Sequence, residues 1–134
     1  MVIEVRVPAQ VDDAAGKTEA STVLEKEDTV AIYGSNEFAA KAIINANGGF
    51  KESKLGADKI LAVGFDSGAL QQDAIRKGIF VGSVTQDPVQ IGYQAVKLAI
   101  AAAKGETVKD VDTGSKWYDA KNIDSDEIKA LLYE

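Results

Sequence analysis

The sequence contains neither cysteine nor histidine, and it has a single tryptophan among its 134 residues. The absence of cysteine excludes a disulfide framework and a thiolate metal site. The absence of histidine removes the commonest metal ligand and the usual general base at neutral pH. We therefore expect no metal and no cofactor. No nucleophilic side chain stands beside a base either, so the sequence does not indicate an enzyme.

Positive charge and long apolar runs are also scarce. Fifteen Lys and Arg residues against 21 Asp and Glu residues give a formal net charge of −6, and no basic cluster interrupts this acidic pattern. Such a surface disfavours binding to nucleic acid. The longest apolar run, at residues 98–103, is far shorter than the ~20 residues that a membrane-spanning helix needs. The first residues lack the apolar stretch of a signal peptide.

The residues that are present alternate between short apolar runs and helical patterns, which is typical of an α/β domain of ordinary size. We predict strands at residues 3–7, 30–33, 60–65 and 79–84, and short extended pieces at 108–111 and 116–118. Helices are predicted near residues 13–24, 38–46, 69–77, 88–103 and 125–132. Nearly continuous apolar strands favour a parallel sheet covered on both faces. The expected fold is a three-layer α/β/α domain with a mainly parallel, flavodoxin-like sheet.

Three polar residues follow the predicted strands: Asn36, Asp66 and Gln86. In an open α/β sheet, ligands bind beyond the carboxyl ends of the strands. A carboxylate can accept hydrogen bonds from two adjacent sugar hydroxyls, and amides can both donate and accept. The sequence therefore predicts a site that binds a polyhydroxylated ligand by hydrogen bonds.

Each of these residues has a simpler interpretation. Asn36 and Asp66 could each cap the helix that follows, since Asn and Asp are favoured N-caps. Gln86 is less easily explained in this way, because Asp87 already supplies a cap there. Trp117 and Tyr118 could stack on a sugar ring, or the pair could simply cover one end of the sheet.

A phosphoacceptor receiver domain has the same size and fold class. Asp66 would be its phosphoacceptor and Asp12–Asp13 its acidic pair. The acidic pair lies beyond Pro8, well past the first predicted strand, so the fit is poor. A dinucleotide site is weaker still, because the sequence has no Gly-rich phosphate-binding motif.

Four motifs in register resemble those of type 1 periplasmic sugar-binding proteins, and they extend over essentially the whole chain. They are the apolar strand followed by Asn-Glu in Val30–Glu37, Val-Gly-Phe-Asp in Val63–Asp66, Gln-Asp-Pro in Gln86–Pro88 with Gly92 after it, and the tail Lys116–Asp124. The resemblance implies that residues 1–134 are the C-terminal lobe of a ribose-binding-like solute-binding protein. Residues 106–123 would be the segment that returns through the hinge.

The resemblance also implies a site and partners. Asn36, Asp66 and Gln86 would hydrogen-bond a monosaccharide, and Trp117 would be a possible additional contact. The partners would be that sugar, an N-terminal lobe and the membrane permease of an ABC transporter, with no nucleic acid. The parent protein would be extracytoplasmic, either periplasmic or a cell-surface lipoprotein. The alternative is the effector-binding lobe of a lactose-repressor-like transcriptional regulator, which shares the fold.

One departure from the family concerns the first strand. The family's lobe opens with a strand and a helix ahead of the segment that matches Val2–Val7, and that strand is central in the sheet. This sequence shows no such segment, which would leave backbone groups unpaired. We expect the sheet to repair itself, either by direct pairing of the flanking strands or by a strand from a second copy in a homodimer.

Overall fold

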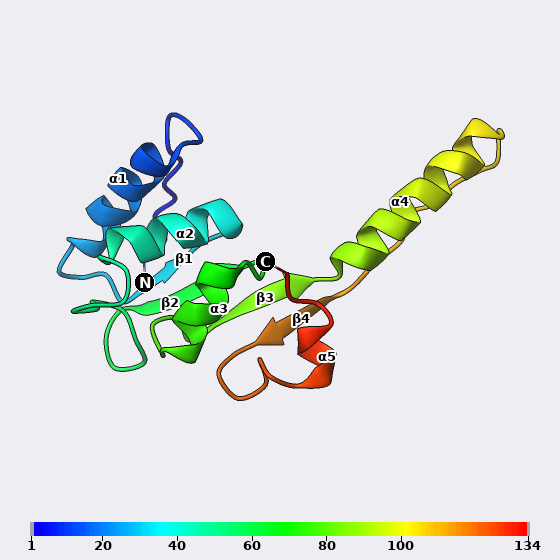
Figure 1. Cartoon of the computed structure of the whole chain (residues 1–134). Helices are drawn as coiled ribbons and strands as arrows, with labels where there is room; N and C mark the ends of the chain where they lie inside the picture. The colour runs from blue at the N-terminus through cyan, green and yellow to red at the C-terminus, as the bar shows by residue number, and fades with distance from the viewer. Residues whose placement is uncertain (1, 134) are drawn as a thin grey trace.

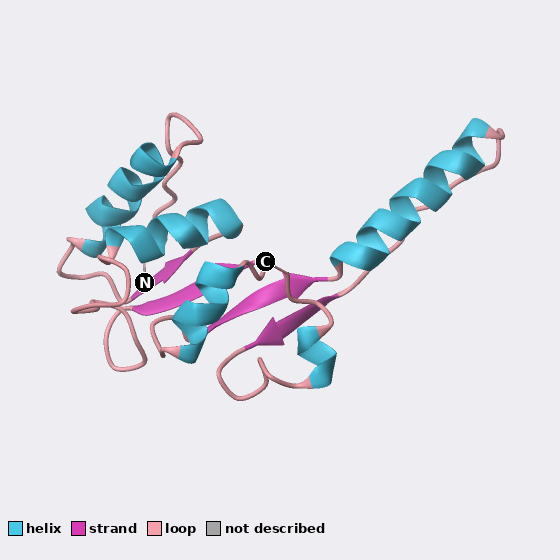
Figure 2. Ribbon diagram, viewed as in Figure 1, coloured by secondary structure: helices cyan, strands magenta, loops and turns pink. Residues whose placement is uncertain are grey.

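The computed structural model describes residues 2–133 and contains one four-stranded open sheet with helices (Figures 1 and 2). The strands lie in the order β1-β2-β3-β4; the first three are parallel, and β4 is antiparallel to β3. This confirms the α/β class and the mainly parallel sheet. The elements are α1 (Asp13–Leu24), β1 (Ala31–Tyr33), α2 (Glu37–Ala46), β2 (Leu61–Phe65), α3 (Ala69–Arg76), β3 (Gly82–Gln86), α4 (Pro88–Ala103), β4 (Ser115–Tyr118) and α5 (Asp126–Lys129).

The core lies between one face of the sheet and the helices α2 and α3. Its largest buried apolar side chains include Ile44 of α2, Ile75 of α3 and Phe80 from the turn before β3. Helix α1 packs against α2, where a Cβ on Gly16 would lie 2.8 Å from the Phe38 ring. Glycine at this position therefore allows the two helices to approach closely. Burial of this apolar surface is the main stabilising contribution to the lobe.

The opposite face of the sheet is open within residues 2–133. Its side chains include the exposed Tyr33, Leu61 and Trp117. The expectation of a third layer was therefore wrong for the described residues. The helix that could have formed it, α4, leaves the end of β3 and extends away from the sheet (Figure 1), and none of its residues is buried. Strand β1, predicted as fully buried, is only partly so. Ala31 and Tyr33 are exposed, because their face of the sheet is open and the strand lies at the sheet edge, while Ile32 packs against the core.

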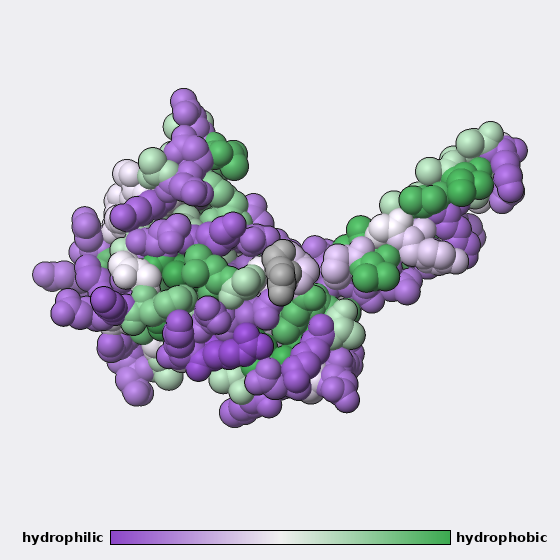
Figure 3. All heavy atoms as spheres, in the orientation of Figure 1, coloured by the Kyte–Doolittle hydropathy of each residue, from purple (hydrophilic) through white to green (hydrophobic). Residues whose placement is uncertain are grey.

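Helix α4 and the return segment 104–114 form a projection that we call the arm. The return segment runs back beside α4 to β4 (Figures 1 and 2). Apolar side chains remain exposed along α4 (Figure 3), among them Val89, Tyr93, Val96 and Ile100. The extended piece expected at residues 108–111 forms no strand. No helix among residues 2–133 has both the length and the apolar character needed to cross a membrane.

The strand predicted at residues 3–7 is absent, and this prediction was wrong. Glu4 forms ion pairs with Arg6 and with Lys26, just after α1, and hydrogen bonds from Lys26 and Arg6 lower the pKa of the Glu4 carboxyl. The apolar side chains of the alternating pattern face solvent: Ile3, Val5 and Val7. A strand requires a hydrogen-bonded neighbour, and among residues 2–133 β1 pairs only with β2. Repair of the sheet by direct pairing of the flanking strands is therefore also wrong.

Element boundaries differ where tertiary contacts override the local pattern. Strand β3 begins at Gly82 instead of residue 79, because Ile79 and Phe80 are buried in the preceding turn and not in the sheet. Helix α5 is shorter than expected, although Ser125 caps it. Asp12 caps α1, and the predicted cap of α4, Asp87, is confirmed.

Candidate functional site

The carboxyl ends of β1, β2 and β3 meet at one edge of the sheet, which we call the rim. Asn36 lies in the turn after β1, Asp66 directly follows β2, and Gln86 is the last residue of β3. Because the three strands are parallel and adjacent, the fold places all three side chains along this edge. The predicted site residues are thus brought to one side of the lobe. Their role in ligand binding remains a prediction.

Asn36 is the N-cap of α2. Its Oδ1 accepts a hydrogen bond from the backbone N–H of Ala39 at 2.8 Å. The capping interpretation is therefore correct for the carbonyl oxygen of this side chain. The Nδ2 group has no hydrogen bond to the described residues, and the residue is exposed. Asn36 can cap its helix and still donate to a ligand.

Asp66 does not cap the helix that follows it. Its Oδ2 accepts a hydrogen bond from the backbone N–H of Glu37 at 2.9 Å, so it caps α2 from the neighbouring strand. Helix α3 starts after Gly68, which provides no side-chain cap. The N-terminus of α2 carries a partial positive charge that favours the carboxylate. The second oxygen, Oδ1, makes no hydrogen bond to residues 2–133 and is free to accept one.

Gln86 lies at the exposed end of β3. The Oδ1 of Asp87 accepts from the N–H of Gln90 at 2.8 Å, which confirms that Asp87 supplies the cap of α4. The Gln86 side chain makes no hydrogen bond to the part of the chain that the structure describes. Its amide can therefore both donate to and accept from a ligand at the rim.

Trp117 is not brought together with these three residues. It lies opposite Val84 on the open face of the sheet, and a Cβ on Gly82 would be 2.1 Å from its ring. The ring therefore points back along β3, away from the rim, while its Nε1 donates to Asp119 Oδ2 at 3.2 Å. This placement gives no support to a stacking role.

The C-terminal segment also reaches the rim, which the sequence pattern did not indicate. The Tyr133 hydroxyl donates to Glu37 Oε2 at 3.4 Å, and Gln72 Nε2 donates to the Tyr133 carbonyl at 2.9 Å. Partial burial and the nearby charges of Asp66 and Glu37 raise the pKa of Tyr133. No local signal could have located this residue, because only the packing after α5 brings it to α2.

A cluster of buried polar residues lies beneath Asp66. Tyr118, Ser83 and Gln71 are all completely buried. The Tyr118 hydroxyl donates to the Asp66 carbonyl at 2.8 Å, and burial raises the pKa of Tyr118 to about 12. Sequence reasoning missed this cluster, because its members come from three elements that are far apart in the sequence.

The Tyr118 pKa predicts a specific loss of stability at alkaline pH. The hydroxyl of the unfolded chain ionises near the ordinary value of 10.0, whereas in the folded protein it stays protonated up to about pH 12. Stability contributed by the neutral hydroxyl is therefore complete below pH 10 and is lost as the pH rises toward 12. We expect the denaturant midpoint of Tyr118→Phe to fall less over this interval than that of the wild type. If the denaturant midpoints of the two proteins fall by the same amount between pH 10 and pH 12, this expectation is wrong.

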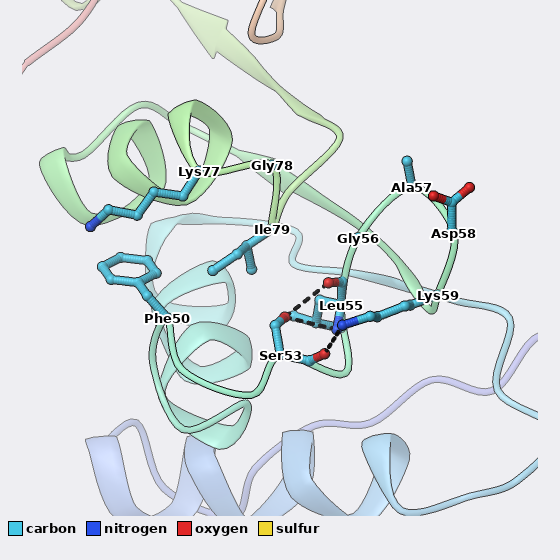
Figure 4. Close-up of a pocket in the computed structure, with 10 residues that line it drawn as sticks. All are labelled: Phe50, Ser53, Leu55, Gly56, Ala57, Asp58, Lys59, Lys77, Gly78 and Ile79. Atoms are coloured by element: carbon cyan, nitrogen blue, oxygen red, sulfur yellow. Dashed lines mark hydrogen bonds between the residues drawn. The ribbon is translucent and has the colours of Figure 1, made fainter.

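None of the three predicted residues lines either of two pockets in the lobe. One, of about 380 Å³, lies at the opposite edge of the sheet, before β2 (Figure 4), where the Lys77 ammonium is 3.8 Å from the centre of the Phe50 ring. The other, of about 110 Å³, lies at the base of the arm beside Asp87 and Ser115. Within residues 2–133 no group of acidic side chains is arranged to hold a metal ion.

A family model described as "periplasmic binding protein domain" matches residues 2–107. The chain belongs to this family. The search of curated proteins found no match.

Solved structures agree with the periplasmic binding protein assignment. A chain from Brachyspira murdochii, described as an ABC transporter, LacI family transcriptional regulator, is 44% identical with a TM-score of 0.86; the alignment covers 99% of this chain and 44% of that one. An ABC transporter solute-binding protein from Agrobacterium vitis with bound D-fucose is 27% identical, with a TM-score of 0.81 and coverage of 97% and 44%. A carbohydrate transporter solute-binding protein from Agrobacterium radiobacter in complex with D-arabinose is 29% identical, with a TM-score of 0.77 and coverage of 91% and 41%.

These matches confirm the resemblance to type 1 periplasmic sugar-binding proteins. The chain spans less than half the length of each of these three structures. The matched portion is one lobe of a periplasmic-binding-protein fold, with the open, mostly parallel sheet described above.

Proposed function

We propose that the chain is the C-terminal lobe of a monosaccharide-binding protein that delivers its ligand to the permease of an ABC transporter. The observation that supports this most directly is the rim, where parallel strands bring Asn36, Asp66 and Gln86 to one edge. Relatives in the same family contain bound D-fucose and D-arabinose. The role is binding and not catalysis, and the parent protein is extracytoplasmic. A lipoprotein anchor stays a prediction.

The chemistry of the rim suits a neutral polyhydroxylated ligand. The free Oδ1 of Asp66 accepts from sugar hydroxyls, and the Asn36 and Gln86 amides donate to or accept from others. The charge on Asp66 strengthens its hydrogen bonds relative to those between neutral groups. One open lobe leaves the ligand in contact with water, so tight binding requires a second lobe that closes over it.

The arm is part of this proposal. Its exposed apolar side chains on α4 form a surface of the kind that marks a protein interface. We assign this surface to packing against the N-terminal lobe, with residues 106–123 as the segment that returns through the hinge. The homodimer hypothesis, in which a second copy pairs with the edge of β1, stays a prediction.

The proposal is tested by sugar titration of the chain joined to the N-terminal lobe of its parent protein. A sugar that binds the folded state raises the melting temperature by mass action, so we expect a concentration-dependent increase with at least one monosaccharide. Amide shifts in the isolated chain should map weak binding of the same sugar to residues 36, 66 and 86. If no monosaccharide shifts the melting temperature of the two-lobe protein, the proposal is wrong.

Asn36→Ser separates capping from binding. Serine is about as good an N-cap as asparagine, so the stability of α2 should be almost unchanged. The variant loses the Nδ2 donor, and monosaccharide affinity of the two-lobe protein should fall by roughly fivefold to tenfold, as expected for one hydrogen bond. Calorimetric titration and thermal unfolding measure the two effects. Unchanged affinity in Asn36→Ser would restrict Asn36 to its capping role.

A regulatory role is the second candidate, and it rests on one observation. The Brachyspira murdochii structure, at 44% identity, is described both as an ABC transporter protein and as a LacI family transcriptional regulator. The lobe would then bind an effector sugar with the same rim. The coding sequence upstream separates the two roles, since a secretory or lipoprotein signal supports transport and a helix-turn-helix supports regulation. No observation favours the receiver-domain hypothesis.

A further inference from the structure

We infer that Tyr118 is a positioning residue for the ligand-binding carboxylate, because its hydroxyl holds the backbone of Asp66 in the conformation that aims the side chain along the rim. This inference rests on the proposed function, since it assigns Asp66 to sugar binding. Tyr118 does not itself reach the rim, because it is completely buried beneath Asp66.

The backbone of Asp66 is in an unfavourable conformation. Its φ of 75° lies in the left-handed region, and only Glu52 shares this feature among the non-glycine residues of the described chain. For an L-residue this conformation costs free energy, and it persists only where surrounding contacts over-determine it. Such contacts must therefore be present around Asp66.

Both sides of the Asp66 backbone are held by hydrogen bonds. Its N–H donates to the Val84 carbonyl at 2.7 Å, which continues the ladder between β2 and β3. Its carbonyl accepts from the Tyr118 hydroxyl at 2.8 Å, from Ser83 Oγ at 3.0 Å and, more distantly, from Gln71 Nε2 at 3.4 Å. A carbonyl oxygen has two lone pairs, so the two short bonds satisfy it fully. The peptide on each side of Asp66 is thus fixed.

The fixed backbone determines where the carboxylate lies. From this conformation Oδ2 reaches the Glu37 N–H, and Oδ1 is left for a ligand. A change of φ toward the extended region would turn the Cα–Cβ bond and break the contact with α2. Gly64 makes room for the network, because a Cβ there would lie 2.7 Å from Gln71 Nε2 and 3.0 Å from Ser83 Oγ.

Tyr118 is the last residue of β4, the strand that returns from the arm. Alternation along β4 places Trp117 on the open face of the sheet and Tyr118 on the covered face. Strand β4 lies within the proposed hinge-return segment 106–123, and it therefore contacts the backbone of a proposed ligand-binding residue 52 positions earlier in the sequence. This gives the motif around Lys116–Asp124 a role at the site that does not require contact with the sugar.

Tyr118→Phe tests the inference because it removes the hydroxyl and keeps the ring. Tyr93→Phe is the matched control, since this hydroxyl is exposed on α4 and makes no hydrogen bond to the described residues. The first measurement is hydrogen exchange in the chain itself. Tyr118→Phe should weaken the hydrogen bond from the Glu37 N–H to Asp66 Oδ2. We therefore expect exchange of the Glu37 amide, relative to that of the Ile44 amide, to become roughly tenfold faster. Normalisation to Ile44 removes any general loss of stability. Tyr93→Phe should leave the ratio unchanged.

Sugar affinity of the two-lobe protein provides the second measurement. Tyr118→Phe should weaken monosaccharide binding severalfold relative to the wild type. In an Asp66→Asn background, where the carboxylate is already lost, Tyr118→Phe should have a much smaller effect on affinity. A role limited to general stability would give the same effect in both backgrounds.

The outcomes separate the inference from the proposed function. If the wild-type two-lobe protein binds no monosaccharide, the proposed function fails, and Glu37 exchange still decides whether Tyr118 holds Asp66. If the wild type binds sugar, and Tyr118→Phe matches the wild type in affinity and Tyr93→Phe in the Glu37 exchange ratio of the chain itself, the inference is overturned. A lower melting temperature of Tyr118→Phe with unchanged affinity and exchange ratio overturns it as well.

Discussion

Replacement of Asp66 by alanine is expected to weaken monosaccharide binding by the two-lobe protein roughly 10- to 100-fold. Hydrogen bonds to a charged group contribute about 1.5–3 kcal/mol each, more than those between neutral groups. The free Oδ1 of Asp66 is the charged acceptor that the structure leaves available at the rim, since Oδ2 is already bonded to Glu37. Calorimetric titration with the sugar that gives the largest thermal shift measures the loss.

Two further variants make the Asp66 result specific. Asp66→Asn keeps the size of the side chain and tolerates the left-handed backbone, so its affinity should lie between those of the wild type and Asp66→Ala. Asp73→Ala removes an exposed carboxylate on α3 that makes no hydrogen bond to residues 2–133, and it should bind sugar like the wild type. Wild-type affinity in Asp66→Ala would remove Asp66 from the site.

Ile44→Ala and Ile100→Ala should differ strongly in their effect on the stability of the chain. Ile44 is 1% exposed in the core, and its truncation is expected to lower the free energy of unfolding by about 2–5 kcal/mol. That is a large share of the ~5–15 kcal/mol typical of a folded domain. Ile100 is 52% exposed on α4, so the same truncation should change stability by no more than about 0.5 kcal/mol. Urea unfolding followed by circular dichroism measures both.

The same pair of variants also tests the arm. In the two-lobe protein, Ile100→Ala should become destabilising by at least about 1 kcal/mol if α4 packs against the N-terminal lobe, because a buried isoleucine loses contacts on truncation. Ile44→Ala serves as the internal standard in both proteins. If Ile100→Ala is neutral in the two-lobe protein, the assignment of the arm to that interface fails.

Local chemistry was sufficient to predict much of the secondary structure. The Asp87–Pro88 start and the Gly105 end of α4 depend on capping and on a left-handed glycine, both of which are short-range effects. Strand β2 was predicted almost to its ends because its apolar residues are consecutive. The segment at residues 3–7 shows the limit of such patterns, since alternation indicates a strand only where a neighbouring strand is present to pair with it.

The candidate site was likewise predictable only in part. The sequence by itself determined that Asn36, Asp66 and Gln86 follow three strands, and the rule that parallel strands end at one edge brought them together. The tertiary structure alone decided that Asp66 caps α2, that Trp117 points away from the rim, and that Tyr118 holds the Asp66 carbonyl. Those contacts join residues from separate elements. Their geometry depends on how the elements pack, which a short sequence pattern does not contain.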